Sequence, residues 1–167
     1  KKGKSADPNK LAQYHNMQIN LKIALNSAYG ALGNQWFRFY DVRNAEAVSV
    51  AGQLSIRWAE RAVNEYLNKV LETDGRDYVI ASDTDSLYVT LDSLVQKVGL
   101  EDKDKTIKFM DSVCDGKIQD VIDKCYSELA EYVNAFQQKM VMKREVLADV
   151  GIWTGKKHYI LNVHNSE

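Results

Sequence analysis

Residues 79–89 read VIASDTDSLYV, in which two apolar stretches enclose a pair of aspartates. The β-branched and aromatic residues before and after the pair favour extended strands, so the aspartates would lie at the tip of a β-hairpin. Two carboxylates this close repel each other, and burying them is costly unless a cation lies between them. The segment is therefore either a solvated turn, where aspartate is common, or a metal site.

Strand geometry makes a metal site possible, although a DxD sequence by itself is more often a surface turn. Residues i and i+2 of an extended strand face the same way, so the carboxylates of Asp83 and Asp85 can approach one point. Mg2+ prefers such oxygen ligands and usually takes one or two carboxylates together with substrate phosphates. The apolar strands on both sides would hold this tip rigidly against the core.

The rest of the chain predicts helices around the hairpin and two further strands. Asp7 and Pro8 form a favourable helix start, and no helix breaker follows before residue 28. Asn44 can cap a second long helix that continues to residue 72. Helices are expected next over 92–98, 104–114 and 117–138, and strands over 140–153 and 156–164. This order predicts an α+β fold in which helices cover one face of an antiparallel sheet.

Composition limits the classes of protein to consider. The 167 residues are 45% apolar and 27% charged, which suits one compact domain or pieces of two. The net charge of −1 gives no overall attraction to nucleic acid, so such a role depends on local patches. No run approaches the roughly 18 apolar residues that a membrane span needs. Cys114 and Cys125 lack the spacing of a zinc site and indicate reduced thiols in a cytosolic protein.

Two further groups of polar side chains have the chemistry to bind a polyanion. The first group is spaced along one face of the first helix and consists of Gln18, Lys22, Asn26 and Tyr29. Its lysine supplies a mobile charge for phosphate, and its amides supply directional hydrogen bonds. The second group is the sequence TGKKHY, in which Lys156, Lys157 and Tyr159 can hold a phosphate backbone. In a strand the two lysines would point to opposite faces, and only one would reach the ligand. Either group can also be an ordinary solvated surface.

The order of these motifs resembles that of the family B DNA polymerases over essentially the whole chain. The sequence KxxxNSxYG at 22–30 is similar to the family's motif at the junction of fingers and palm, and DTDS at 83–86 to its catalytic palm motif. The sequence KKxY at 156–159 is similar to its basic motif near the thumb, although His158 stands where the family usually has arginine. The stretches NSAYGALGNQWFRFYDVRNAEA and NEYLNKV most resemble the replicative polymerases of large tailed T4-type bacteriophages.

The resemblance implies a fold, an activity and a set of partners. Residues 1–30 would be the end of the fingers, 31–155 the palm with its antiparallel sheet and catalytic β-hairpin, and 156–167 the start of the thumb. The activity would be template-directed transfer of a nucleotide from a dNTP to the primer 3′ hydroxyl, with two Mg2+ ions as cofactors. Primer–template DNA and dNTP would be the substrates, the place of action would be the cytoplasm of a bacterial host, and no membrane would be involved.

The family's site residues transfer to matching positions of this chain. Asp85 is implied as a ligand of both Mg2+ ions and Asp83 as the second acidic residue of the motif. Glu145, in the sequence MKREV, matches an acidic position near the metal site and is a further candidate ligand. The implied nucleotide-binding residues are Lys22, Asn26 and Tyr29, and the implied DNA-binding residues are Lys156, Lys157 and Tyr159.

Several parts of the family's pattern are missing from this sequence. They are the palm motif with the other essential aspartate, the exonuclease domain and most of the thumb, and the sequence begins at Lys1 without a methionine. We therefore expect a piece of a longer polymerase, or one subunit of a split polymerase, that does not polymerise DNA by itself. The remainder would be supplied in cis or by a second chain, and a sliding clamp would be contacted through regions outside this chain.

Three other functions remain open at this stage. The chain can be a non-catalytic α+β module that binds nucleic acid through Lys22, Lys156 and Lys157. It can be a structural fragment that is stable only when docked on the rest of a polymerase. A metal-dependent glycosyltransferase also uses a DxD motif, but it leaves Lys22 and the KKHY sequence unexplained.

Overall fold

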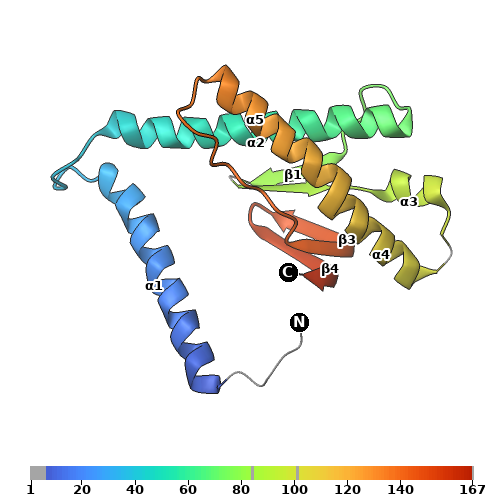
Figure 1. Cartoon of the computed structure of the whole chain (residues 1–167), viewed down its shortest axis with the longest axis horizontal. Coiled ribbons are helices and arrows are strands. Elements are labelled where there is room, and N and C mark those ends of the chain that lie inside the picture. The colour runs from blue at the N-terminus through green and yellow to red at the C-terminus, as the bar shows by residue number, and fades with distance from the viewer. Residues whose placement is uncertain (1–6, 84, 101, 167) are drawn as a thin grey trace. The chain divides into compact units, whose positions relative to one another are not determined.

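The computed structural model describes residues 7–83, 85–100 and 102–166. In chain order the elements are α1 (Pro8–Leu32), α2 (Val42–Leu71), β1 (Val79–Asp83), β2 (Ser86–Val89), α3 (Asp92–Val98), α4 (Lys103–Val113), the π-helical turn η1 (Cys114–Ile118), α5 (Gln119–Tyr132), β3 (Val146–Gly155) and β4 (His158–Ser166). Figure 1 labels the α-helices and strands β1, β3 and β4. Contacts within the chain divide it into two units, Lys1–Ala51 and Gly52–Glu167.

The first unit contains α1 and the beginning of α2. The predicted start of α1 is confirmed, because the Asp7 carboxylate accepts the N–H of Asn9 at 3.0 Å and Pro8 occupies the first turn. The second helix was predicted to begin after a cap at Asn44, and this is wrong, since α2 begins at Val42. Asp41 is the cause: its carboxylate accepts the N–H of Arg43 at 3.0 Å, and its carbonyl accepts the N–H of Ala45 at 3.2 Å.

The core of the second unit lies between α2 and α5, which cross each other in Figure 1. Both helices contribute one apolar face, and the buried cluster consists of Ala59, Val63, Leu67, Tyr78, Ile118, Ile122, Cys125, Tyr126 and Leu129. Tyr78 is fully buried directly before β1, and its hydroxyl lies 2.8 Å from Thr73 Oγ1. The Thr73 hydroxyl donates to Asn68, so the Tyr78 hydroxyl donates to Thr73 and no hydrogen-bonding group is lost on burial. Tyr78 therefore anchors the hairpin that follows it.

The chain from α4 to α5 is continuous, whereas the sequence predicted an interruption between 114 and 117. Gly116 lies inside η1, a π-helical turn that joins the two α-helices. The predicted end of the last helix at residue 138 is also wrong, since α5 ends at Tyr132. Asn134 adopts a left-handed backbone with φ of 51°, a conformation that ends helices, and its N–H returns to the Glu131 carbonyl at 3.0 Å.

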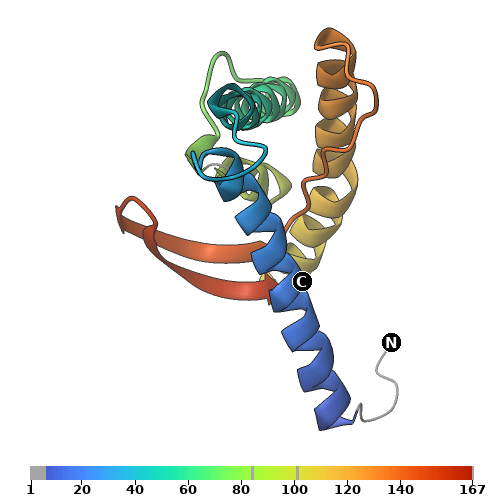
Figure 2. The ribbon, with the colours of Figure 1, turned by 90° about the vertical axis from the view of Figure 1, so that its left-hand side faces the viewer.

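The strands form antiparallel hairpins, which agrees with the predicted α+β class but not with one continuous sheet. Within the part of the chain that the structure describes, β1 pairs with β2 and β3 pairs with β4 in two separate two-stranded sheets. Figure 2 shows the second pair as a long ribbon. The predicted strand over 140–153 begins only at Val146, because the segment before it is bonded to α5 instead: the Gln119 side chain donates to the Met142 carbonyl at 2.9 Å.

Candidate active site

The two aspartates lie where the β1–β2 hairpin reverses direction. Asp83 is the last residue of β1 and is paired with Ser86, the first residue of β2. Asp85 is exposed and lies in the turn between the strands, and Thr84 lies outside the described residues. The expectation that both carboxylates share one face of an extended strand does not apply here, because strand alternation ends at Asp83. The side chain of Asp83 is half-buried, with 31% of its surface exposed.

The two lysines of the basic motif also lie in a turn rather than in a strand, which corrects the prediction that they point to opposite faces of a strand. Gly155 pairs with His158, so Lys156 and Lys157 form the connection between β3 and β4. Lys157 has a left-handed backbone with φ of 63°, which is costly for a residue with a side chain. Its Nζ lies 3.6 Å from Oδ2 of Asp83. The structure therefore brings the acidic hairpin and the basic motif together.

Three aromatic rings join the same two hairpins beside this ion pair. The ring of Tyr88 on β2 lies 5.5 Å from Trp153 on β3 and 5.3 Å from Tyr159 on β4, edge to face in both cases. The rings of Trp153 and Tyr159 are 6.3 Å apart. A hydrogen bond with Tyr159, followed by burial, raises the pKa of Tyr88. Edge-to-face contacts of this kind stabilise a fixed arrangement of the hairpins.

The predicted nucleotide-binding face lies on α1, in the first unit. Gln18, Lys22 and Asn26 are exposed there, as a ligand-binding face requires. The hydroxyl of Tyr29 lies 2.6 Å from that of Ser49 on α2. Ser49 donates its hydrogen to the Ala45 carbonyl, so the Tyr29 hydroxyl donates to Ser49. Ser49, the partner that orients Tyr29, was not predicted, because a serine within a helix gives no such signal in the sequence.

The acidic hairpin has the donor chemistry for Mg2+ but supplies only part of a ligand set. Among the described residues no group of three or more His, Cys, Asp and Glu side chains is placed to hold a metal ion. Glu145, an exposed residue directly before β3, therefore does not complete such a group with Asp83 and Asp85. Mg2+ usually takes one or two carboxylates and completes its shell with water and phosphate, and the exposed carboxylate of Asp85 has the chemistry of such a ligand.

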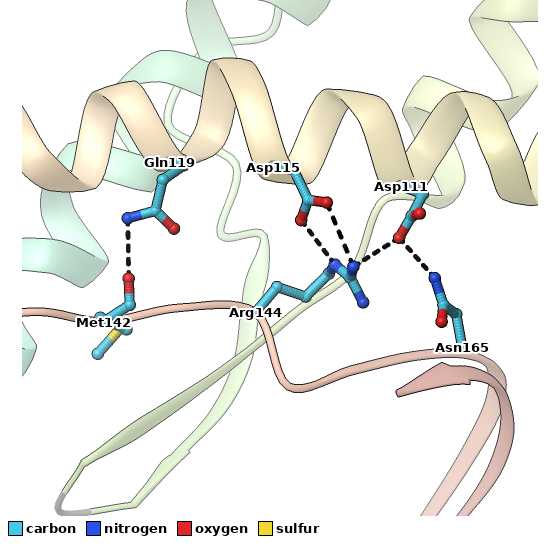
Figure 3. A network of polar contacts seen from close by, with 6 residues as sticks. All are labelled: Asp111, Asp115, Gln119, Met142, Arg144 and Asn165. Carbon is cyan, nitrogen blue, oxygen red and sulfur yellow. Dashed lines mark hydrogen bonds and ion pairs between the residues drawn. The ribbon is translucent and has the colours of Figure 1, made fainter. Parts of the chain in front are cut away.

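A second feature that the sequence did not reveal fixes the base of the β3–β4 ribbon (Figure 3). Arg144, whose side chain is 12% exposed, lies 2.6 Å from Asp111 on α4 and donates to Asp115 on η1 from Nε at 3.1 Å and Nη2 at 3.4 Å. Asn165 on β4 donates to the same Asp111 at 2.8 Å. These carboxylates raise the pKa of Arg144, chiefly through the hydrogen bond to Asp115. One aspartate therefore fastens both strands of the ribbon to α4 at the base of the ribbon.

The ribbon has another attachment to the start of α4. Asp149 on β3 accepts from Lys103 at 2.8 Å, lies 2.8 Å from His164 and accepts from Asn162 at 2.7 Å. The Lys103 ammonium, followed by the His164 imidazole, holds the pKa of Asp149 well below its usual range. These contacts join residues that are not sequence neighbours, so no local motif predicts them.

Comparisons with known proteins agree with the motif order. The model of the protein family described as DNA polymerase family B matches residues 2–160. The chain is 45% identical over 161 residues to a DNA-directed DNA polymerase of Escherichia phage RB69, and 43% identical over 161 residues to that of Enterobacteria phage T4; each match covers 90% of this chain and 18% of the relative. A DNA polymerase beta of African swine fever virus (isolate Pig/Kenya/KEN-50/1950) is 32% identical over 151 residues, which cover 85% of this chain and 12% of that protein. The chain thus spans less than a fifth of the length of these relatives.

Within the described ranges, no helix has the length and apolar character needed to cross a membrane.

Proposed function

As the chain belongs to DNA polymerase family B and is similar to the polymerases of T4-type phages, we propose that it forms the fingers–palm part of a DNA-directed DNA polymerase. The observation that carries the proposal is the family match across residues 2–160, which contains all three polar motifs. The ion pair between Asp83 and Lys157 supports it, because it places the acidic and basic motifs side by side. We assign 1–30 to the fingers, 31–155 to the palm and 156–167 to the start of the thumb.

The proposed reaction is nucleotidyl transfer. The oxygen of the primer 3′ hydroxyl attacks the α-phosphorus of the dNTP, a new phosphodiester forms, and the bond to pyrophosphate breaks while the hydroxyl proton leaves to solvent. Two Mg2+ ions held chiefly by Asp85, with Asp83 as the second acidic residue, would lower the pKa of that hydroxyl and offset the charge of the triphosphate. Asp85 is the principal carboxylate in this assignment, Asp83 is the second, and Glu145 is a candidate at the edge of the site.

The exposed face of α1 binds the incoming nucleotide in this proposal. Lys22 offsets the negative charge of the triphosphate as pyrophosphate departs. Asn26 offers an amide that hydrogen-bonds near the sugar and phosphates. Tyr29, with its hydroxyl held by Ser49, lies against the minor-groove edge of the new base pair, where contacts depend on shape rather than sequence.

The turn between β3 and β4 grips the primer–template duplex. Lys156 and Lys157 contact phosphates, and Tyr159 supports the turn from β4. Phosphate contacts bind DNA without regard to sequence, which a replicative enzyme requires. Histidine at position 158 carries less positive charge at neutral pH than the arginine usual in the family, so we expect one backbone contact to be weaker.

The other partners follow from the same proposal. Primer–template DNA and dNTP are the substrates, and the remainder of the polymerase supplies the other palm aspartate, the exonuclease and the thumb, in cis or as a second chain. A sliding clamp binds through those other regions, and the enzyme acts in the cytoplasm of the infected bacterium. The chain alone lacks one principal carboxylate, and each 1.4 kcal/mol of lost transition-state stabilisation is about tenfold in rate, so we propose that it is inactive by itself.

Primer extension tests the proposal. The chain is assayed with Mg2+ and four dNTPs, first alone and then with an N-terminal polymerase fragment that carries the missing aspartate. We expect extension only in the mixture, and none when Asp85→Asn replaces the unsubstituted chain. A mixture that associates, as seen by size-exclusion chromatography, but does not extend the primer would contradict the catalytic assignment and favour a module that only binds nucleic acid.

A further inference from the structure

The two aspartates of the hairpin differ in their surroundings, and this difference suggests different tasks. Asp83 lies 3.6 Å from the Lys157 ammonium, whereas Asp85 is exposed in the turn. We infer that Asp83 is a positioning residue for Lys157: it holds the lysine ammonium in place for the primer–template duplex, and Asp85 is the main metal ligand. The inference rests on the proposed function and assigns a role within it.

Burial indicates which partner of the pair is fixed. The side chain of Asp83 is 31% exposed and that of Lys157 is 65% exposed. A lysine carries its charge on a long flexible stem, whereas the shorter aspartate at the end of β1 has little freedom. The carboxylate therefore restricts the positions of the ammonium, rather than the reverse.

The surrounding structure keeps this pair in register. The rings of Tyr88, Trp153 and Tyr159 join the β1–β2 hairpin to the β3–β4 ribbon next to the pair. At the other end of the ribbon, Arg144 and Asp149 attach it to α4 and η1. Lys157 therefore sits at the end of a ribbon that is supported at both ends, as a group that must be placed accurately requires.

Charge explains why Asp83 is poorly suited to be the principal metal ligand. A carboxylate beside an ammonium ion is already partly neutralised and attracts a divalent cation less strongly. A Mg2+ ion bound at Asp83 would also be repelled by Lys157 at short range. An exposed ion pair adds little to folding stability, so placement of the lysine is the more effective role.

Lysine reactivity in the chain itself tests the ion pair without DNA or metal. The chain is acetylated with a limiting amount of an acetyl N-hydroxysuccinimide ester, and the modified lysines are quantified by mass spectrometry. We expect Asp83→Asn to raise the acetylation rate of Lys157 by about two- to fivefold, the range that corresponds to an exposed ion pair. Lys156, in the same turn, is the internal control and should not change. An unchanged rate at Lys157 would overturn the inference.

Binding of a fluorescent primer–template in EDTA tests the role in DNA binding. Removing a negative charge normally tightens DNA binding, and this is the expected direction for Asp85→Asn. If Asp83 positions Lys157, Asp83→Asn should weaken binding despite the same change in charge. The double variant Asp83→Asn/Lys157→Met should bind no more weakly than Lys157→Met alone, because the carboxylate acts only through the lysine.

The outcomes separate the inference from the proposed function. Tighter binding by Asp83→Asn, or a full additional loss in the Lys157→Met background, would refute the positioning role even if acetylation changes. If the unsubstituted chain does not bind primer–template, alone or with its N-terminal fragment, the proposed function and the positioning role both fail. The acetylation result then still decides whether Asp83 holds Lys157.

Discussion

Replacing Arg144 by methionine should destabilise the second unit more than any surface charge change. Arg144 is the 12% exposed centre of a network in which its guanidinium contacts Asp111 on α4 and Asp115 on η1. Methionine has a flexible apolar stem that fills similar space, so the substitution removes the charge contacts with little loss of packing. Two carboxylates would then remain next to each other without their common cation.

The magnitude follows from how exposed the partners are. Removing one member of a fully buried ion pair costs roughly 3–5 kcal/mol, whereas exposed pairs contribute about 1 kcal/mol or less. Asp111 and Asp115 are 31% and 52% exposed, so water screens part of the charge. Among the described residues, Nη1 of Arg144 is buried without a hydrogen-bond partner. Burying an unpaired N–H group destabilises the fold, and methionine removes this group, so part of the loss is offset. We therefore expect a loss on the order of 2 kcal/mol in the free energy of unfolding.

Urea unfolding followed by circular dichroism measures this loss. With a slope of about 1–3 kcal/mol per molar urea, the midpoint of Arg144→Met should fall by about 1 M. Arg61→Met is the matched control, since Arg61 pairs with Glu65 at 2.7 Å but both side chains are largely exposed, and its midpoint should not move measurably. Equal midpoints for the two variants would refute the claim that the Arg144 network holds the ribbon to the helices.

Three further predictions concern the same ribbon. Gly151→Ala should lower the free energy of unfolding by about 1–3 kcal/mol, because a Cβ there would lie 2.5 Å from the Trp153 ring. In the control Gly155→Ala, the new Cβ meets no atom within 4 Å, and the substitution should be tolerated. Equal urea midpoints for the two variants would contradict this steric argument. Lys157→Gly should raise the free energy of unfolding by about 0.5–1 kcal/mol, and with it the urea midpoint, because glycine adopts the left-handed backbone without strain. The same substitution should weaken primer–template binding. A lower urea midpoint would show that the turn is not strained. The pKa of Asp149 is lowered in the folded chain, so its stabilising contribution is complete above its ordinary pKa of 3.8 and is lost as pH falls through the lower folded value. The difference in urea midpoint between the unsubstituted chain and Asp149→Asn should therefore shrink below about pH 4. A difference that stays constant with pH would exclude this linkage.

Local chemistry in the sequence was enough to predict several elements and the family. The start of α1 followed from Asp7 and Pro8, since capping depends only on neighbouring residues. The β1–β2 hairpin followed from apolar residues on both sides of the aspartates. The family followed from the order of three short motifs, because such motifs keep the spacing of the fold to which they belong.

Element boundaries depended on contacts that lie outside the local pattern. The segment before β3 had the composition of a strand, but the Gln119 side chain on α5 donates a hydrogen bond to the Met142 carbonyl, and the strand begins only at Val146. The two lysines of the basic motif looked like strand residues, yet the pairing of Gly155 with His158 places them in a turn. Strand propensity cannot decide which neighbour a backbone group will bond to.

The pairing of Lys157 with Asp83, and of Arg144 with Asp111 and Asp115, was decided only by the tertiary structure. Each pair joins residues far apart in the chain, and any of the chain's many lysines, arginines and aspartates had the right charge. Charge attraction is not directional enough to select partners from sequence. Packing of α2 against α5 and of the aromatic rings between the hairpins sets which charges meet, because only a fixed core brings distant side chains within a few ångströms of each other.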